Sequence, residues 1–181
     1  MARTFRRRRD GRITVRLRAD EVALLRIVAR DVLLIIAAPP EGDVGARLYP
    51  RAYLDPTEED AENEFRALVH HDLAEQRHAA LAMLLDKLPA VDPDAAIQAG
   101  DEAGADFDLT ADEALQWLTA VNDARLVLGT ALGITEDDDG DFAPDDPRYD
   151  LGTCYHWLTF RQTELVEVLL DGIGEAGTDD D

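Results

Sequence analysis

The sequence predicts a mainly α-helical fold, a four-helix bundle-like domain that begins with a two-stranded β-hairpin. Four long segments repeat apolar residues at helical spacing, and one short segment alternates apolar and polar residues beside an Asp-Gly pair. The chain has 181 residues, of which 46% are hydrophobic and 31% charged, so it is long enough to bury one core. We expect a single domain over residues 1–170 and a disordered acidic tail over residues 171–181.

The hairpin is predicted at residues 3–18, with its turn at Asp10-Gly11. A two-residue loop would pair Phe5 with Arg16 and turn Phe5 away from the apolar face. A three-residue loop with a left-handed glycine pairs Phe5 with Val15 and buries both side chains. We favour the second register because a shift of one residue exchanges the two faces of a strand.

Four helices are predicted, at residues 20–38, 57–88, 110–132 and 150–170. The first follows the acids Asp20-Glu21 and ends at Pro39-Pro40. Its apolar stripe consists of Val22, Leu25, Val28, Val32, Ile35 and Ile36.

The other helix ends are read from capping residues and prolines. Thr57, followed by acids, is the expected N-cap of the second helix, and Pro89 is its expected end. Thr110 and Gly133 are the expected N-cap and C-cap of the third helix. The connections are predicted as an irregular or single-turn segment at residues 48–54, a mobile loop at residues 90–108 and an acidic loop at residues 136–146.

Charge is distributed unevenly along the chain. The first 18 residues hold eight arginines and one acid, a formal charge of +7. Because the net charge of the whole chain is −21, the remaining 163 residues carry −28. The candidate anion-binding residues are Arg6, Arg8, Arg12 and Arg16. Nucleic acid and the acidic body of the protein are both partners of suitable charge. We favour pairing within the protein, because the apolar hairpin face implies docking and the acidic body opposes DNA.

One helix carries a metal-ligand candidate. His71, Glu75 and His78 share a helix face by their spacing, and Glu75 to His78 matches the Glu-x-x-His pattern of di-iron bundles. Such a site needs a second motif and two further glutamates, and the sequence has no second motif. We therefore expect no metal and no cofactor, and keep a metal-dependent enzyme as an alternative.

The single cysteine, Cys154, is the redox candidate. Nothing in the sequence around it indicates an activated thiol, and a lone cysteine is most often a small buried hydrophobe. The chain also lacks a glycine-rich phosphate loop, a Ser-His-Asp order and a CxxC pair. These observations favour a protein that is not an enzyme.

Polar residues within two apolar helices predict a contact between those helices. The candidate interaction residues are Trp117, Asn122 and Arg125 in the third helix, and Trp157, Arg161 and Gln162 in the fourth. Buried polar groups must be paired. We expect Arg125 to meet a carboxylate such as Glu164, and Asn122 to meet Gln162.

No segment is apolar enough to span a membrane, and no signal peptide is visible, so we expect a cytoplasmic protein without membrane contact. The hairpin could also form a homodimer through an exposed strand edge.

Four stretches carry a resemblance to a known family, at residues 17–25, 47–53, 117–129 and 157–162. On these stretches, which lie within residues 3–170, the chain resembles an actinobacterial domain-of-unknown-function family typically encoded next to the ClpS protease adaptor. Some of its members are named AosR-type oxidative-stress transcription regulators.

The resemblance implies a cytoplasmic regulator that acts on transcription with RNA polymerase or a sigma factor, under redox control through cysteines. This chain has one cysteine, which excludes an intramolecular disulfide switch within it. The expected function is non-enzymatic regulation of transcription through protein contacts. The alternatives are an accessory or adaptor factor for ClpS-linked proteolysis and the metal-dependent enzyme.

Overall fold

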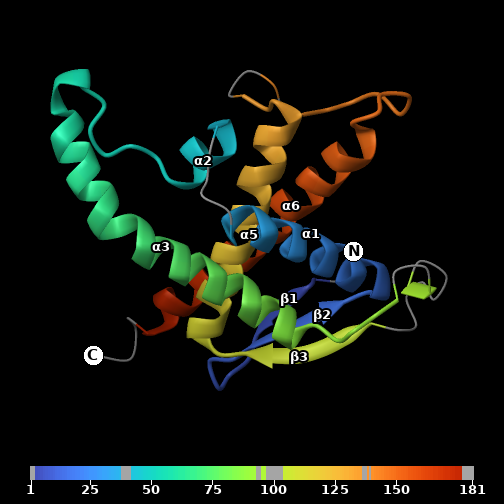
Figure 1. Ribbon diagram of the computed structural model, residues 1–181. Helices are drawn as coiled ribbons and strands as arrows, with labels where there is room; N and C mark the ends of the chain where they lie inside the picture. The colour runs from blue at the N-terminus through green and yellow to red at the C-terminus, as the bar shows by residue number, and fades with distance from the viewer. Residues whose placement is uncertain are drawn as a thin grey trace.

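A three-stranded antiparallel sheet lies against one side of a helical assembly (Figure 1). The computed structural model describes residues 3–37, 42–92, 95–96, 104–135, 138 and 140–176. The strands are β1 (Phe5–Arg7), β2 (Ile13–Leu17) and β3 (Ala105–Leu109). The helices are α1 (Ala19–Ala37), α2 (Gly42–Leu48), the 3-10 turn η1 (Pro56–Glu58), α3 (Glu59–Lys87), α5 (Ala111–Leu132) and α6 (Tyr149–Ala176). The prediction of a mainly helical fold with an N-terminal hairpin is confirmed.

The hairpin adopts the register that buries Phe5. Phe5 pairs with Val15, and Gly11 has a φ of 80°, the left-handed conformation that the three-residue loop requires. Phe5 and Val15 are 2% and 0% exposed, so both lie in the core. The alternation of side chains along a strand explains this register, because a shift by one residue would expose Phe5.

The third strand was not predicted. Ala105–Leu109 pairs antiparallel with β2, where the sequence indicated a loop over residues 90–108. Ala105, Phe107 and Leu109 alternate with two aspartates, so the strand has one apolar and one acidic face. Of the predicted loop, residues 93–94 and 97–103 lie outside the described residues.

Helix ends match the prediction in some places and differ in others. Thr110 and Glu113 form a capping box, and Gly133 ends α5 with a φ of 72°, as predicted. Thr57 is not the cap of α3, because Glu58 occupies the N-cap position and makes no side-chain capping bond. Asp55 caps the preceding turn η1 by accepting hydrogen bonds from the N–H and the hydroxyl of Thr57.

Two further differences concern helix extent. Gly42–Leu48 is helical where no helix was predicted. The last helix continues to Ala176, six residues into the predicted tail, and residues 177–181 lie outside the described part of the chain.

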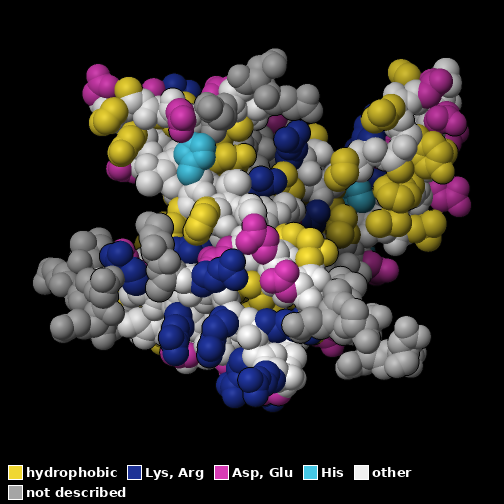
Figure 2. Space-filling view, turned by 180° about the vertical axis from the view of Figure 1, so that it is seen from behind, with side chains coloured by type: hydrophobic (Ala, Val, Ile, Leu, Met, Phe, Trp, Pro, Cys, Tyr) yellow, Lys and Arg dark blue, Asp and Glu magenta, His cyan; other side chains and the backbone are white. Residues whose placement is uncertain are grey.

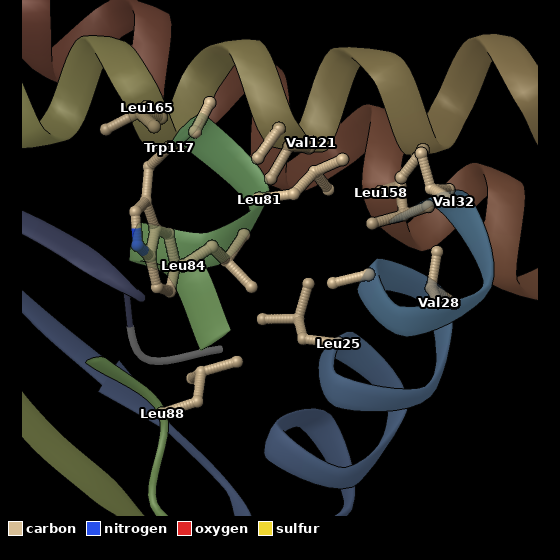
Figure 3. Packing of buried hydrophobic residues seen from close by; sticks show 14 of the residues in the cluster. Leu25, Val28, Val32, Leu81, Leu84, Leu88, Trp117, Val121, Leu158 and Leu165 are labelled. Carbon is tan, nitrogen blue, oxygen red and sulfur yellow. The ribbon is translucent and has the colours of Figure 1, made fainter. Parts of the chain in front are cut away.

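Helix α5 lies at the centre and contacts α1, α2, α3, α6 and β3. Trp117, 1% exposed, points from α5 toward the sheet beside Leu84 of α3 (Figure 3). Its ring meets the rings of Phe5 and Phe107 edge-on, with centroids 6.1 and 5.6 Å away. Sheet and helices therefore share one core.

The N-terminal half of α3 projects from this core (Figure 1). We call residues 50–68 the α3 arm; they comprise the segment before α3 and the first part of that helix. Within the arm only Glu62 is buried, and its carboxylate accepts hydrogen bonds from the backbone of Ala52 and Tyr53 and from Arg66. The arm is therefore held by polar contacts and has no apolar core of its own.

Candidate functional site

Arg161 of α6 lies between two carboxylates from different parts of the chain. Its guanidinium donates to Glu21 at 2.7 Å and to Glu164 at 3.0 Å, and the indole of Trp157 donates to the same Glu21 oxygen at 3.1 Å. The Arg161 side chain is 12% exposed, and its guanidinium lies 5.3 Å from the Trp157 ring centroid. We call Glu21, Trp157, Arg161 and Glu164 the Arg161 network.

The Arg161 network connects the first strand to the helices. The second oxygen of Glu164 accepts the N–H of Thr4 at 2.6 Å and of Phe5 at 3.4 Å. The second oxygen of Glu21 accepts the N–H of Arg18 at 2.9 Å, where the hairpin enters α1. Glu164 thus satisfies buried donors on the hairpin, and Glu21 accepts an exposed donor at the end of the hairpin, which indicates a structural role for both.

The predicted contact between α5 and α6 forms with different partners. Gln162 donates to Asn122 at 3.1 Å. Arg125 does not meet Glu164; its Nε is buried and has no hydrogen-bond partner in the described structure. Glu164 pairs with Arg161 because the two lie three residues apart on one helix.

Trp117 was grouped with these polar residues in the prediction, but it lies in the core. Its Nε1 has no hydrogen-bond partner among the described groups, and its ring packs against the sheet.

A second buried pair, Arg77 of α3 and Asp123 of α5, was not predicted. Their side chains, 13% and 1% exposed, form a salt bridge. Arg77 also donates to the carbonyl of Leu48 at 2.7 Å, and its guanidinium lies 5.4 Å from the Tyr49 ring centroid. Burial raises the pKa of Asp123, and the charge of Arg77 opposes that rise.

The sequence did contain a signal for this pair. Asp123 lies three residues after Ala120 and four before Val127, on the apolar stripe of α5. An acid in such a position requires a cation.

The metal candidates are not assembled into a site. His71 and Glu75 are 78% and 70% exposed and lie 3.5 Å apart, and His78 is also exposed. Over the described residues, no three His, Cys, Asp or Glu side chains are grouped so that they could hold a metal ion.

Cys154 lies in the apolar core and is 7% exposed. Burial raises the pKa of its thiol to about 11. At neutral pH the sulfur is therefore the protonated thiol, the unreactive form.

The four arginines predicted as an anion site share the outer face of the sheet. Arg6, Arg12 and Arg16 are exposed, as is Arg8, which points the same way by strand alternation. We call the face formed by Arg6, Arg8, Arg12 and Arg16 the arginine face; Lys and Arg side chains gather over the lower part of the molecule in Figure 2.

Two of these arginines pair with aspartates of β3. Arg8 meets Asp108 at 2.7 Å and Arg16 meets Asp106 at 2.8 Å. Asp108 also accepts from Thr14 at 2.7 Å, and this bond together with Arg8 and the charge of Arg12 lowers the pKa of Asp108.

Pairing within the protein therefore accounts for half of the arginine face. Arg6 and Arg12 have no ion pair with any described residue. The acids that meet Arg8 and Arg16 lie in the hairpin turn, at Asp10, and in β3, at Asp106 and Asp108.

No described helix is long and apolar enough to cross a membrane.

A family model described as "Domain of unknown function (DUF2017)" matches residues 2–169. The oxidative stress regulator AosR of Mycobacterium tuberculosis (strain ATCC 25618 / H37Rv) is 31% identical over 120 residues, which cover 64% of this chain and 50% of that protein. The putative oxidative stress regulator AosR of Mycobacterium leprae (strain TN) is 30% identical over 145 residues, or 74% of this chain and 61% of that protein. The chain thus spans about half the length of the first of these relatives. No solved structure gives a significant match.

Proposed function

The chain belongs to the DUF2017 family, and from this premise we propose that it is a non-enzymatic regulatory protein of the oxidative-stress response. We propose further that it acts through protein contacts with the transcription machinery, RNA polymerase or a sigma factor. The relatives named as oxidative stress regulators support the first part. The second part depends on the surface of the chain.

The observation that carries the proposal is the apolar surface of the α3 arm. Leu54, Leu68 and Tyr53 are 81%, 68% and 38% exposed. Hydrophobic side chains are visible over the projecting lobe in Figure 2. Exposed apolar side chains gathered on one projecting element are typical of a protein-binding surface.

The polar groups capable of chemistry are largely committed to structure. Arg161 is held between two carboxylates, Arg77 is paired with Asp123, and the thiol of Cys154 is buried with a raised pKa. This pattern supports binding rather than catalysis. It also supports regulation that does not depend on oxidation of the thiol in this chain.

Affinity capture of the tagged full chain from its native host tests the proposal, with nuclease added to remove contacts through nucleic acid. We expect a polymerase or sigma subunit to be retained by the wild type and lost with Leu54→Glu/Leu68→Glu. Leu151→Glu/Leu170→Glu, which changes two exposed leucines of α6 and alters the net charge equally, is the matched control.

Failure of the wild type to retain any transcription subunit would contradict the proposal. Retention of a Clp component in its place would favour the adaptor alternative.

A further inference from the structure

The arginine face keeps free hydrogen-bonding capacity despite its ion pairs. A guanidinium has five N–H donors, and the salt bridges from Arg8 and Arg16 use only part of them. The side chains of Arg8 and Arg16 are 47% and 68% exposed. Arg6 and Arg12 add two exposed guanidinium groups without an ion pair to described residues. All four can therefore meet an external anion.

The sheet holds these charges in a fixed pattern. Arg6 lies opposite Thr14, and Arg8 lies opposite Arg12, where the amide of Arg8 donates to the carbonyl of Arg12 at 2.8 Å. Neighbouring strands are about 5 Å apart, and alternate residues along a strand are about 7 Å apart. A planar array of cations at this spacing suits a ligand with repeated anionic groups.

The rest of the face discriminates between classes of polyanion. By the strand register, the other described residues on it are Thr14, which is buried, and the aspartates Asp106 and Asp108. It therefore offers no aromatic side chain on which single-stranded bases could stack. It also offers no apolar anchor of the kind found at the centre of protein–protein interfaces. Contacts to duplex phosphates need only arginines.

We propose that the arginine face binds the phosphate backbone of double-stranded DNA. The choice of DNA as the duplex rests on the proposed function in transcription. The binding is electrostatic and is carried by contacts between the guanidinium groups and the phosphate oxygens. Because residues 19–181 carry −28, DNA is held at this face alone, and the affinity depends strongly on salt.

Fluorescence anisotropy with the purified full chain and a labelled random-sequence DNA duplex tests this proposal. If four arginines neutralise phosphates, the logarithm of the binding constant falls with the logarithm of salt concentration with a slope of about −3 to −4. Arg6→Ala/Arg12→Ala breaks no ion pair with described residues and should reduce the slope by about 2 and weaken binding at least about tenfold at low salt.

The matched control is Arg30→Ala/Arg47→Ala, which removes two exposed arginines of α1 and α2 and changes the net charge equally. This control should bind as tightly as the wild type. Equal losses in both double variants would overturn the assignment to the arginine face. Far-UV circular dichroism shows that each variant is folded.

Three other outcomes would overturn the proposal: no duplex binding at low salt, tighter binding of a single strand of the same length, or equal competition by polyglutamate. The last would identify an acidic protein segment as the better ligand. A polymerase or sigma subunit retained by Arg6→Ala/Arg12→Ala after nuclease treatment would leave the proposed function intact. The two proposals can thus fail separately.

Discussion

At the scale of single residues, Cys154 distinguishes this chain from a thiol sensor. The thiol is buried, and its pKa is raised from 9.0 to about 11 by that burial. A rise of two pH units lowers the thiolate fraction at neutral pH about a hundredfold. We expect N-ethylmaleimide to alkylate native Cys154 at about one hundredth of the rate seen in urea, or more slowly. The native rate should still be rising between pH 9 and 11, because the thiolate accumulates there.

Mass spectrometry of the alkylated protein measures this rate, and the urea-unfolded chain is its control. Equal rates in the native and unfolded protein would contradict the burial of the thiol. Cys154→Ser should leave the capture of partners unchanged under oxidant.

The buried pair of Arg77 and Asp123 leads to a second residue-scale prediction. Asp123→Leu leaves the Arg77 guanidinium in a buried site without its carboxylate, so we expect the free energy of unfolding to fall by about 3–5 kcal/mol. Arg77→Met should have a similar effect. The double variant should recover much of the loss, because no unpaired charge then remains.

Urea denaturation of the wild type, both single variants and the double variant completes a double-mutant cycle and measures the coupling energy of the pair. Additive losses would show that the two residues do not act as a pair.

At the scale of elements, the alternation of side chains along a strand was enough to predict the hairpin register. Phe5 and Val15 had to share the buried face, so the hairpin register followed from alternation alone. The strand Ala105–Leu109 has the same alternation, but its five residues follow a stretch rich in Asp, Gly and Ala. Its pairing with β2 is a contact between segments about 90 residues apart, which local patterns do not show.

The sequence analysis assigned the wrong partner to Glu164. It placed Arg125 of another helix opposite Glu164, whereas Arg161, three residues away on the same helix, forms the ion pair.

Strand β3 approaches β2 closely at Gly104, which gives an element-scale prediction. A Cβ atom at Gly104 would overlap the backbone carbonyl oxygen of Leu17, which cannot move without breaking the sheet. We expect Gly104→Ala to displace β3, to lower the free energy of unfolding by about 1–3 kcal/mol and to speed amide hydrogen exchange in residues 105–109.

Gly11→Ala is the comparison for this variant. It strains a turn with a φ of 80° but meets no atom within 4 Å, so its effect should be confined to the hairpin tip. Unchanged exchange in β3 with Gly104→Ala would contradict the close approach.

At the scale of the whole molecule, the separation of charge is only partly neutralised by the fold. The arginine-rich start of the chain meets acids in two ways: inside the protein, where Glu21 and Glu164 hold Arg161 and the hairpin backbone, and on the sheet surface, where Asp106 and Asp108 hold Arg16 and Arg8. The buried contacts fasten the hairpin to the helices. The surface contacts leave the arginine face open to solvent.

These two kinds of contact should differ in what they contribute to stability. Glu164→Gln and Asp106→Asn each remove one negative charge beside an arginine, so each relieves the repulsion within a chain of net charge −21 equally. Glu164→Gln also weakens the hydrogen bonds to Thr4, Phe5 and Arg161 in a buried site, and we expect a loss of about 3 kcal/mol. Asp106→Asn breaks only an exposed pair and should cost less than about 1 kcal/mol. Urea denaturation at moderate salt measures both, and similar losses in the two variants would show that the hairpin is not fastened through Glu164.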